Sequence, residues 1–402
     1  MTINPGDAGL DELMLLTIAA KSIQHKLHRK REIWRYKMDR NASGPWPVAG
    51  FLMATALATT ISGSAAAQSP APKIFSRSSA SAAQSYWTPQ RMAAAKPKGI
   101  LASGAIQPTA TPLATGAPGA AGGLMPGGQA INRLQFPLLQ SPSRPAAAPI
   151  PADGAFPGPY TTYQYAGRYL LYPISTIGKL FFTEPGVGNF VCSASVTYGG
   201  SALNIVWTAG HCVANGGHSA FYTNWLYCPS YDSAQGGVNP AVGCWSWSFA
   251  TTSSEWFTSG TLSRDYAIIG LQPNGTVKNA NVATVTGGLG FAWNWARDQA
   301  WFFLGYPAAS PFTGGKVILT ASEHRYDDSG QGSPPTNSWG SNQTPGASGS
   351  PGILFFTLNG GYINTDTSYY YTSQAGQELQ GPYFDSEVCN FWKSNTGYTG
   401  TC

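Results

Sequence analysis

Short apolar runs separated by turn-forming residues fill the chain from about residue 160 to its C-terminus. Runs of five to seven residues, rich in Val, Ile, Tyr, Phe and Trp, occur at 179–183, 190–196, 204–208, 266–271, 300–304, 316–321 and 352–357. Such runs between Gly, Asn, Ser and Pro predict strands, and many of them predict a sandwich or barrel. Strands and helices do not alternate, and only residues 386–393 have a helical pattern. We therefore expect an all-β domain over 160–402 with a short C-terminal helix.

A leader is predicted at the N-terminus. Residues 48–61 are uncharged and mostly apolar, follow a basic run at 26–37, and precede three alanines before Gln68. A basic flank, a short apolar core and a small-residue site predict a secretory signal peptide, cleaved before Gln68. The apolar run has fourteen residues, fewer than the roughly 18 that a membrane span needs. Whether the leader begins at residue 1 or at Met38 stays open.

Between this leader and the β domain, residues 68–159 are rich in Ala, Pro, Ser, Gly and Thr. Few aromatic or β-branched side chains are present there to offset the entropy of ordering the chain. We therefore expect a disordered propeptide or linker with extended Pro-rich stretches. The predicted organisation is a leader over 1–67, a propeptide or linker over 68–159, and a folded domain over 160–402.

Charge is sparse and unevenly distributed. Asp, Glu, Lys and Arg make up 10% of the chain, against about 25% in average soluble proteins, which argues against coiled coils and long solvated helices. Residues 1–165 carry a net charge of +9, and residues 166–402 carry −4. Because the basic excess lies outside the predicted β domain, that domain lacks the electrostatic footprint of a nucleic-acid-binding protein.

All six cysteines lie in the predicted β domain. They are Cys192, Cys212, Cys228, Cys244, Cys389 and Cys402. An even number of cysteines behind a secretory leader predicts disulfides in an oxidising compartment, although six cysteines allow fifteen pairings. A zinc site is the rival interpretation, but no C-x-x-C or paired Cys/His spacing supports it. We therefore expect no metal.

Two acid–base candidates stand at the ends of apolar runs. His211 lies in the block Thr-Ala-Gly-His-Cys, which directly follows a strand-like run. A side chain placed there lies at a strand edge, where an imidazole can act as a general base. Asp265 opens the run at 266–271, where a carboxylate can orient an imidazole and fix its tautomer. Taken alone, His211 is more often a structural histidine and Asp265 an ordinary strand-start aspartate.

A candidate nucleophile lies in the block Gly-Ala-Ser-Gly-Ser-Pro, residues 346–351. Ser348 between small residues fits a tight turn that exposes its hydroxyl. The backbone N–H groups of Gly346 and Ser348 then point together as an oxyanion hole. In a chain this rich in Gly and Ser, the block taken alone is more often a plain surface loop.

Together the three motifs are far more specific. The order is His211, Asp265, Ser348, with separations of 54 and 83 residues. The order and the two blocks resemble the chymotrypsin-fold serine peptidases, and the resemblance extends over residues 166–395. It looks closest to the secreted bacterial trypsin-like and glutamyl-endopeptidase-like branches. The segments 190–196, 303–307 and 381–384 also resemble recurring features of those branches.

The resemblance implies two packed six-stranded antiparallel β-barrels with the catalytic cleft between them. The first barrel would supply His211 and Asp265, and the second would supply Ser348. The resemblance also implies a Cys192–Cys212 bridge beside the histidine. By proximity along the chain, the remaining pairs are then Cys228 with Cys244 and Cys389 with Cys402.

Two departures from the family pattern bear on activation. Many relatives have Asp directly before the nucleophile, where it pairs with a newly cleaved N-terminal ammonium; this chain has Ala347 there. An Ile-Val-Gly-Gly start near residue 170 is missing as well. Activation is therefore expected either through removal of a spacer that shields the cleft or from a domain already ordered in the precursor.

Specificity is assigned from the same resemblance. Asn342 stands six residues before Ser348, where trypsin-like relatives that cut after Arg or Lys carry Asp, so basic-residue specificity is disfavoured. Gln343 beside it predicts a polar, uncharged pocket floor, and Thr365 lies in the run expected to form the pocket wall. Glutamyl specificity stays open, although Asp366 would oppose an acidic substrate if it faced the pocket.

These observations predict a secreted serine endopeptidase that works through an acyl-enzyme, without metal or organic cofactor. Its partners would be protein or peptide substrates, with no nucleic acid and no membrane span in the mature form. We expect a monomer, located outside the cell or in the periplasm if the source is Gram-negative. The alternative is an inactive peptidase-fold binding or adhesion module, against which the presence of all three triad residues argues.

Overall fold

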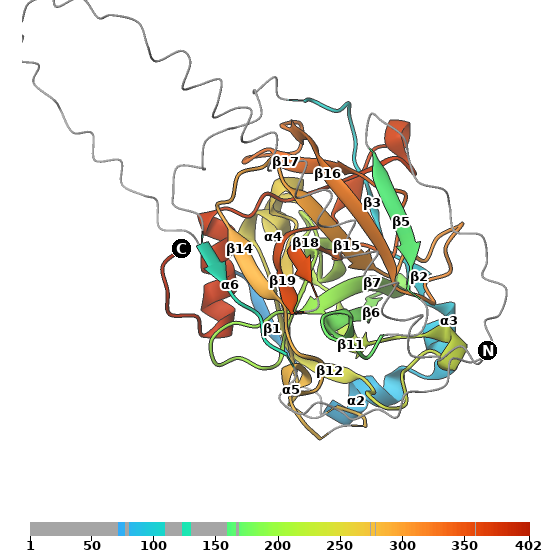
Figure 1. Cartoon of the computed structure of the whole chain (residues 1–402). Helices are drawn as coiled ribbons and strands as arrows, with labels where there is room; N and C mark the ends of the chain where they lie inside the picture. Colours follow the sequence, from blue (N-terminus) through green and yellow to red (C-terminus); the bar gives the residue numbers. More distant parts are fainter. Residues whose placement is uncertain are drawn as a thin grey trace, which may run out of the picture. The chain divides into compact units, whose positions relative to one another are not determined.

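A closed barrel of six antiparallel strands forms the first half of the β domain in the computed structural model (Figure 1). Its strands are β6 (Ile177–Glu184), β7 (Gly188–Val196), β8 (Ile205–Thr208), β11 (Thr223–Pro229), β12 (Trp245–Thr252) and β13 (Ala267–Leu271). They follow one another in the order β12-β11-β6-β7-β8-β13, and pairing of β12 with β13 closes the barrel. The structure describes residues 71–76, 80–108, 123–129, 159–165, 169–273, 275–277, 279–357 and 359–402.

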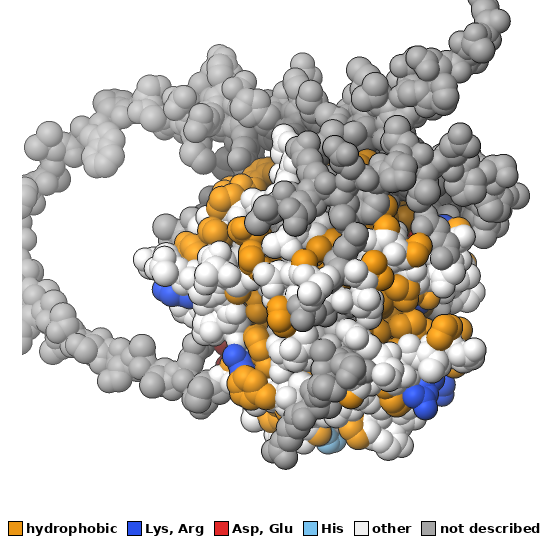
Figure 2. Space-filling model, turned by 90° about the horizontal axis from the view of Figure 1, so that it is seen from below, with side chains coloured by type: hydrophobic (Ala, Val, Ile, Leu, Met, Phe, Trp, Pro, Cys, Tyr) orange, Lys and Arg blue, Asp and Glu red, His pale blue; other side chains and the backbone are white. Residues whose placement is uncertain are grey.

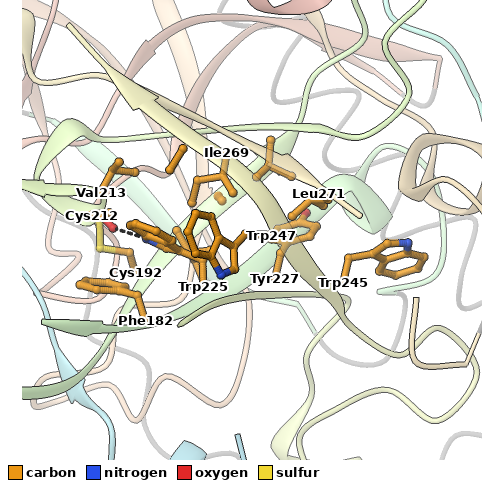
Figure 3. Close-up of a cluster of buried hydrophobic side chains, with 14 of the residues drawn as sticks. Phe182, Cys192, Cys212, Val213, Trp225, Tyr227, Trp245, Trp247, Ile269 and Leu271 are labelled. Atoms are coloured by element: carbon orange, nitrogen blue, oxygen red, sulfur yellow. Dashed lines mark hydrogen bonds between the residues drawn. A yellow bond between two sulfur atoms is a disulfide. The ribbon is translucent and has the colours of Figure 1, made fainter. Parts of the chain in front are cut away.

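Large aromatic side chains fill the interior of this barrel (Figure 3). Trp225 and Trp247 meet edge to face with ring centroids 4.7 Å apart. The indole N–H of Trp225 donates to the carbonyl oxygen of Cys212, at 3.0 Å, so its polar atom is satisfied inside the core. Burial of each large apolar side chain contributes about 1.5–3 kcal/mol. The aromatic residues that predicted strands therefore also supply the barrel's packing.

A second, mostly antiparallel sheet forms the other half of the domain. Six of its strands run consecutively in the order β21-β17-β16-β15-β18-β19. They are β15 (Ala300–Gly305), β16 (Ile318–Asp328), β17 (Thr336–Gly340), β18 (Pro351–Thr357), β19 (Gly360–Asp366) and β21 (Glu378–Gly381). Phe303 stacks on Trp339 at 4.2 Å in its core. The strands β5 (Tyr160–Gln164), β14 (Gly290–Trp293) and β20 (Tyr369–Tyr370) extend this sheet.

The predicted C-terminal helix is α6 (Ser386–Thr396). Asp385 caps it by accepting hydrogen bonds from the backbone N–H groups of Glu387 and Val388, which satisfies donors that a helix start leaves unpaired. Trp392 anchors the helix: its ring stacks on Phe291 at 4.7 Å, and its N–H donates to the Thr197 hydroxyl. The helix therefore ties the first barrel to the second sheet.

Three disulfides hold the domain, and they match the expected pairing. They join Cys192 to Cys212, Cys228 to Cys244, and Cys389 to Cys402. The other described elements are short. They are α4 (Ser254–Ser259), α5 (Val282–Thr286), β9 (Ala214–Asn215), β10 (Ala220–Phe221) and the 3-10 helices η1 (Ile174–Thr176), η2 (Gly210–Cys212), η3 (Ser233–Gln235), η4 (Leu262–Arg264) and η5 (Thr372–Gln374). The predicted chymotrypsin-like all-β fold is confirmed.

Parts of the region predicted as disordered carry regular structure. They are β1 (Lys73–Phe75), α2 (Ala80–Tyr86), α3 (Pro89–Ala94), β2 (Lys96–Pro97), β3 (Ile100–Leu101) and β4 (Gly123–Met125). We call residues 80–108 the N-terminal arm. The arm lacks the apolar residues for a core of its own, but Trp87 and Met92 bury themselves against β11 and its neighbours. Composition alone misses this, because it measures what a segment can bury within itself.

The predicted leader, its cleavage before Gln68 and the start at Met38 all lie outside the described residues. The division at residue 160 stays a prediction, since the described arm packs with the β domain in one compact unit. Within the part of the chain that the structure describes, no helix is long and apolar enough to cross a membrane. Lys and Arg side chains are few on the face in Figure 2, in keeping with the low charge content.

Candidate active site

The pairing of two neighbouring strands brings His211 and Asp265 together. Strand β8 ends at Thr208 and β13 begins at Ala267, and these two residues pair directly across the ladder. The end of β8, which leads into the histidine turn η2, therefore lies beside the start of β13, which follows Asp265. Two residues that are 54 positions apart in sequence thus meet at one end of the first barrel.

Asp265 holds His211 from two directions. One carboxylate oxygen, Oδ2, lies 2.7 Å from the imidazole Nδ1, and the other, Oδ1, accepts the backbone N–H of His211 at 2.7 Å. The Ser368 hydroxyl donates to Oδ2 as well. Both side chains are almost fully buried, with His211 1% and Asp265 0% exposed. A carboxylate at Nδ1 favours the tautomer with its proton on Nδ1, which leaves Nε2 free to accept a proton.

Gly210 makes this close approach feasible. A Cβ atom there would lie 2.8 Å from Asp265 Oδ1 and 2.7 Å from Cδ1 of Trp256. Both neighbours are buried, so neither has room to move aside. The glycine of the Thr-Ala-Gly-His-Cys block is therefore needed for the carboxylate to reach the histidine backbone.

Ser348 lies in the turn that precedes β18, and the first barrel fixes this turn. The backbone N–H of Ser193, on β7, donates to the Ser348 carbonyl at 2.8 Å. Gly349 has a positive φ of 81°, and a Cβ there would run into Thr208 and the Ser193 carbonyl. The serine turn of the second sheet is therefore pressed against the strand end that leads to His211.

Gly346 supplies a backbone donor beside the serine hydroxyl. Its φ of 100° is a conformation that favours glycine. Its N–H donates at 2.7 Å to a carbonyl oxygen, that of Lys98 in the N-terminal arm, and the Ser348 hydroxyl donates to the same oxygen at 3.2 Å. A donor that meets a carbonyl oxygen next to a nucleophile is the geometry expected of an oxyanion hole.

In the part of the chain that the structure describes, the three predicted specificity residues hydrogen-bond to groups outside the triad. Gln343 is buried, and its Nε2 donates to Ile318 O and to the Thr320 hydroxyl at 3.2 and 3.0 Å. Thr365 donates to the Pro382 carbonyl, and Asn342 accepts from Thr162. Gln343 thus satisfies backbone and hydroxyl groups of β16. The role of all three in substrate binding stays a prediction.

Two polar residues near the site were not assigned by sequence. The Ser368 hydroxyl donates to Asp265, but nothing in the sequence next to Ser368 distinguishes it from the many other serines. Asp366 is fully buried, and its Oδ2 accepts the indole N–H of Trp207 at 2.7 Å. Burial, with the charge of Asp265 as a further cause, raises the pKa of Asp366 well above its ordinary value.

One cluster of potential metal ligands occurs among the described residues, namely Cys192, His211 and Cys212. Both sulfurs are joined in the Cys192–Cys212 disulfide. A disulfide sulfur is not a thiolate, and zinc requires thiolate, imidazole or carboxylate ligands. The cluster therefore fits a bridge beside the histidine and does not fit a metal site.

The structure resembles solved serine proteases. It matches the thermostable serine protease AL20 from an extremophilic microorganism at a TM-score of 0.50 and 32% identity, covering 56% of this chain and 98% of that one. It matches the protease Anisep from Arthrobacter nicotinovorans at a TM-score of 0.51 and 27% identity, covering 59% and 100%. No family model and no curated protein matches the sequence. Since the first relative is matched over nearly its whole length, the chain belongs to the chymotrypsin-fold serine protease family.

Proposed function

We propose that the chain is a serine endopeptidase that hydrolyses peptide bonds through His211, Asp265 and Ser348. The observation that carries this proposal is the buried Asp265–His211 pair next to a serine whose hydroxyl, together with the Gly346 N–H, meets a peptide carbonyl oxygen. A peptidase needs these groups in this arrangement, and this requirement favours it over an inactive binding module.

The proposed reaction has two halves. Ser348 Oγ attacks the peptide carbonyl carbon while His211 Nε2 takes its proton, and Asp265 stabilises the imidazolium that forms. The Gly346 N–H, joined by that of Ser348, stabilises the tetrahedral oxyanion. His211 then protonates the leaving amine, and water attacks the acyl-enzyme with His211 as base. Apart from this water, each step uses only groups of the chain and of the substrate.

The setting we propose is outside the cell or in the periplasm. Three disulfides support it, since disulfides persist in oxidising compartments. Detection of Gln68 as a free N-terminus in the culture medium tests both the secretion and the predicted leader. We expect protein or peptide substrates and no preference for Arg or Lys, because the uncharged Asn342 replaces the Asp of relatives that cut after these residues.

Labelling with a fluorophosphonate, an electrophile for activated serines, tests the proposal. Protein freed of its N-terminal arm should be labelled, and a Ser348→Ala variant should not. Ser350→Ala is the matched control, because it removes a hydroxyl from the same turn and should leave labelling unchanged. Circular dichroism must show that all three proteins are folded. Absence of labelling in folded, arm-free protein would refute the proposal and favour the binding module.

A further inference from the structure

One extended stretch of the N-terminal arm runs between the two halves of the domain. We call residues 96–102 the crossing segment. Its first part, β2, pairs parallel with β7, and the Lys98 N–H donates to the Val191 carbonyl at 3.0 Å. Its second part, β3, pairs parallel with β20, and the Ala102 N–H donates to the Tyr370 carbonyl at 2.9 Å. A peptide that adds itself to two strand edges is bound through its backbone, largely independent of its sequence.

The crossing segment meets the catalytic groups at Lys98. Its carbonyl oxygen accepts both the Gly346 N–H and the Ser348 hydroxyl. The hydroxyl proton therefore points at the bound oxygen. His211 Nε2 has no hydrogen-bond partner among the residues that the structure describes. A serine whose proton is held by the carbonyl oxygen does not deliver it to the imidazole, so this arrangement is bound but not reactive.

The direction of the crossing segment is opposite to the one cleavage needs. His211 protonates the leaving amine, so the part of a substrate that follows the attacked carbonyl belongs on the histidine side. That side is marked by β7, because its Cys192 is bridged to Cys212, the neighbour of His211. Here the part that precedes the Lys98 carbonyl lies along β7, and the part that follows it lies along β20.

Side chains on both sides of Lys98 hold the crossing segment in place. The Lys98 ammonium pairs with Glu184 at 2.6 Å and lies over the Phe190 ring, 4.6 Å from its centroid. Gly99 lies so close to Pro345 that a Cβ would stand 2.9 Å from the proline Cβ and 3.2 Å from its Cα. Trp87 upstream is 4% exposed, and its indole donates to Asn224 O at 2.6 Å.

The arm is also anchored downstream, on the second sheet. Ala102 is buried in a cluster with Trp256 and Tyr369. The Gln107 N–H donates to Asp328 Oδ1, whose other oxygen accepts the Tyr371 hydroxyl at 2.6 Å. Because anchors lie on both halves, a single cut outside residues 80–108 leaves the crossing segment where it is.

We propose that the N-terminal arm is a built-in inhibitor that binds the active site of its own chain with reversed chain direction. The proposal rests on the proposed function, since an inhibitor requires an active serine. The arm occupies the oxyanion donor and the strand edges that a substrate needs. Its chain direction is reversed, however, so the amine that would leave lies on the side away from His211 and cannot be protonated by it. The protein is thereby latent until the arm is degraded or dissociates.

Fluorophosphonate labelling of the intact full-length chain, read from the uncleaved band, tests the proposal. The intact wild type should be labelled slowly, and protein freed of the arm rapidly. Gly99→Val should speed labelling of the intact chain by about tenfold or more, because the added side chain has no space beside the Pro345 backbone. Gln90→Val is the matched control, since Gln90 is exposed on α3 of the same arm. It should leave the rate unchanged.

A charge exchange makes the test specific for the observed contact. Lys98→Glu should also speed labelling, because it places two carboxylates together. The double variant Lys98→Glu with Glu184→Lys should return the rate toward that of the wild type. A general loss of folding would not be repaired in this way. Glu184→Lys alone supplies the remaining corner of the cycle.

The outcomes separate the inhibitor from the proposed function. Equal labelling rates of intact and arm-free wild type would overturn the inhibitor and leave the peptidase standing. No labelling of arm-free protein that circular dichroism shows to be folded would refute the peptidase itself. Mass spectrometry tests the direction: the bond between Lys98 and Gly99 should stay uncut in the intact chain. A product that ends at Lys98, formed by the wild type but not by Ser348→Ala, would overturn reversed binding.

Discussion

Replacing Asp265 with Asn tests how the site controls the histidine tautomer. The carboxylate accepts three donors: the His211 backbone N–H at Oδ1, and His211 Nδ1 and the Ser368 hydroxyl at Oδ2. An asparagine keeps one oxygen and gains an NH₂ group. If the oxygen stays at the backbone N–H, the NH₂ faces Nδ1 and stabilises the tautomer with its proton on Nε2. That tautomer cannot accept the proton of Ser348.

The opposite orientation of the asparagine is the less stable one. It turns the NH₂ group toward the backbone N–H of His211, two donors face to face at a site with 0% exposure of Asp265. A buried unsatisfied donor costs about 1–3 kcal/mol, so the orientation with the unreactive tautomer predominates. We expect kcat/KM to fall by about 10³–10⁴-fold, which corresponds to about 4–5.5 kcal/mol of transition-state stabilisation.

Steady-state cleavage of a peptide substrate by arm-free protein measures this loss, with thermal unfolding as the check on folding. Ser368→Ala is the comparison, because it removes one donor to Asp265 and leaves the Asp265–His211 pair. It should lower kcat/KM by no more than about tenfold, the equivalent of one hydrogen bond. A folded Asp265→Asn variant with less than a tenfold loss would refute the tautomer argument.

Three further predictions concern stability and packing. Gly210→Ala should lower activity by more than about tenfold and destabilise the fold by about 1–3 kcal/mol, measured by denaturant unfolding, because its Cβ overlaps Asp265. Burial raises the pKa of Glu387 from 4.5 to about 7. The folded chain then binds the Glu387 proton more tightly than the unfolded chain, so stability should fall as pH rises between these values, and Glu387→Gln should flatten that part of a Tm–pH curve. Replacing Cys389 and Cys402 with serine opens a loop with a sequence separation of 13 and should lower the unfolding free energy by about 2–3 kcal/mol; an unchanged value would mean that the other contacts of helix α6, Trp392 among them, hold it without the bridge.

The sequence predicted the parts of the site that depend on local chemistry. The blocks around His211 and Ser348 need glycines for close backbone approach, and these glycines can be read directly from the sequence. The alternation of apolar, aromatic-rich runs with turn residues likewise predicted the strands, because the side chains that a strand buries belong to its own short run of sequence. The predicted His211–Asp265 pair follows from two apolar runs that become neighbours in the barrel.

Other parts depend on long-range contacts that no local pattern records. Ser368 is one serine among many until the fold places it beside Asp265. The amide of Gln343 bonds groups of β16 that its sequence neighbours do not indicate, and its place in a pocket floor stays a prediction. The arm around Trp87 resembles a linker by composition. Its partners are residues of the folded domain more than 80 positions away, Asn224 among them, so its own sequence does not reveal that it packs. Such pairings arise from docking onto a preformed surface, which composition does not describe.

The bond between Ser193 and the Ser348 carbonyl makes catalysis a property of the finished chain. The strands of the first barrel end before the chain reaches Ser348 or Ser368. This barrel carries His211 and Asp265, but neither the nucleophile nor Ser368. Because the serine turn takes its position from β7 of the other half, the proposed hydrolysis requires that the two halves have docked. If the chain is the proposed peptidase, an undocked chain would be inactive even without the N-terminal arm.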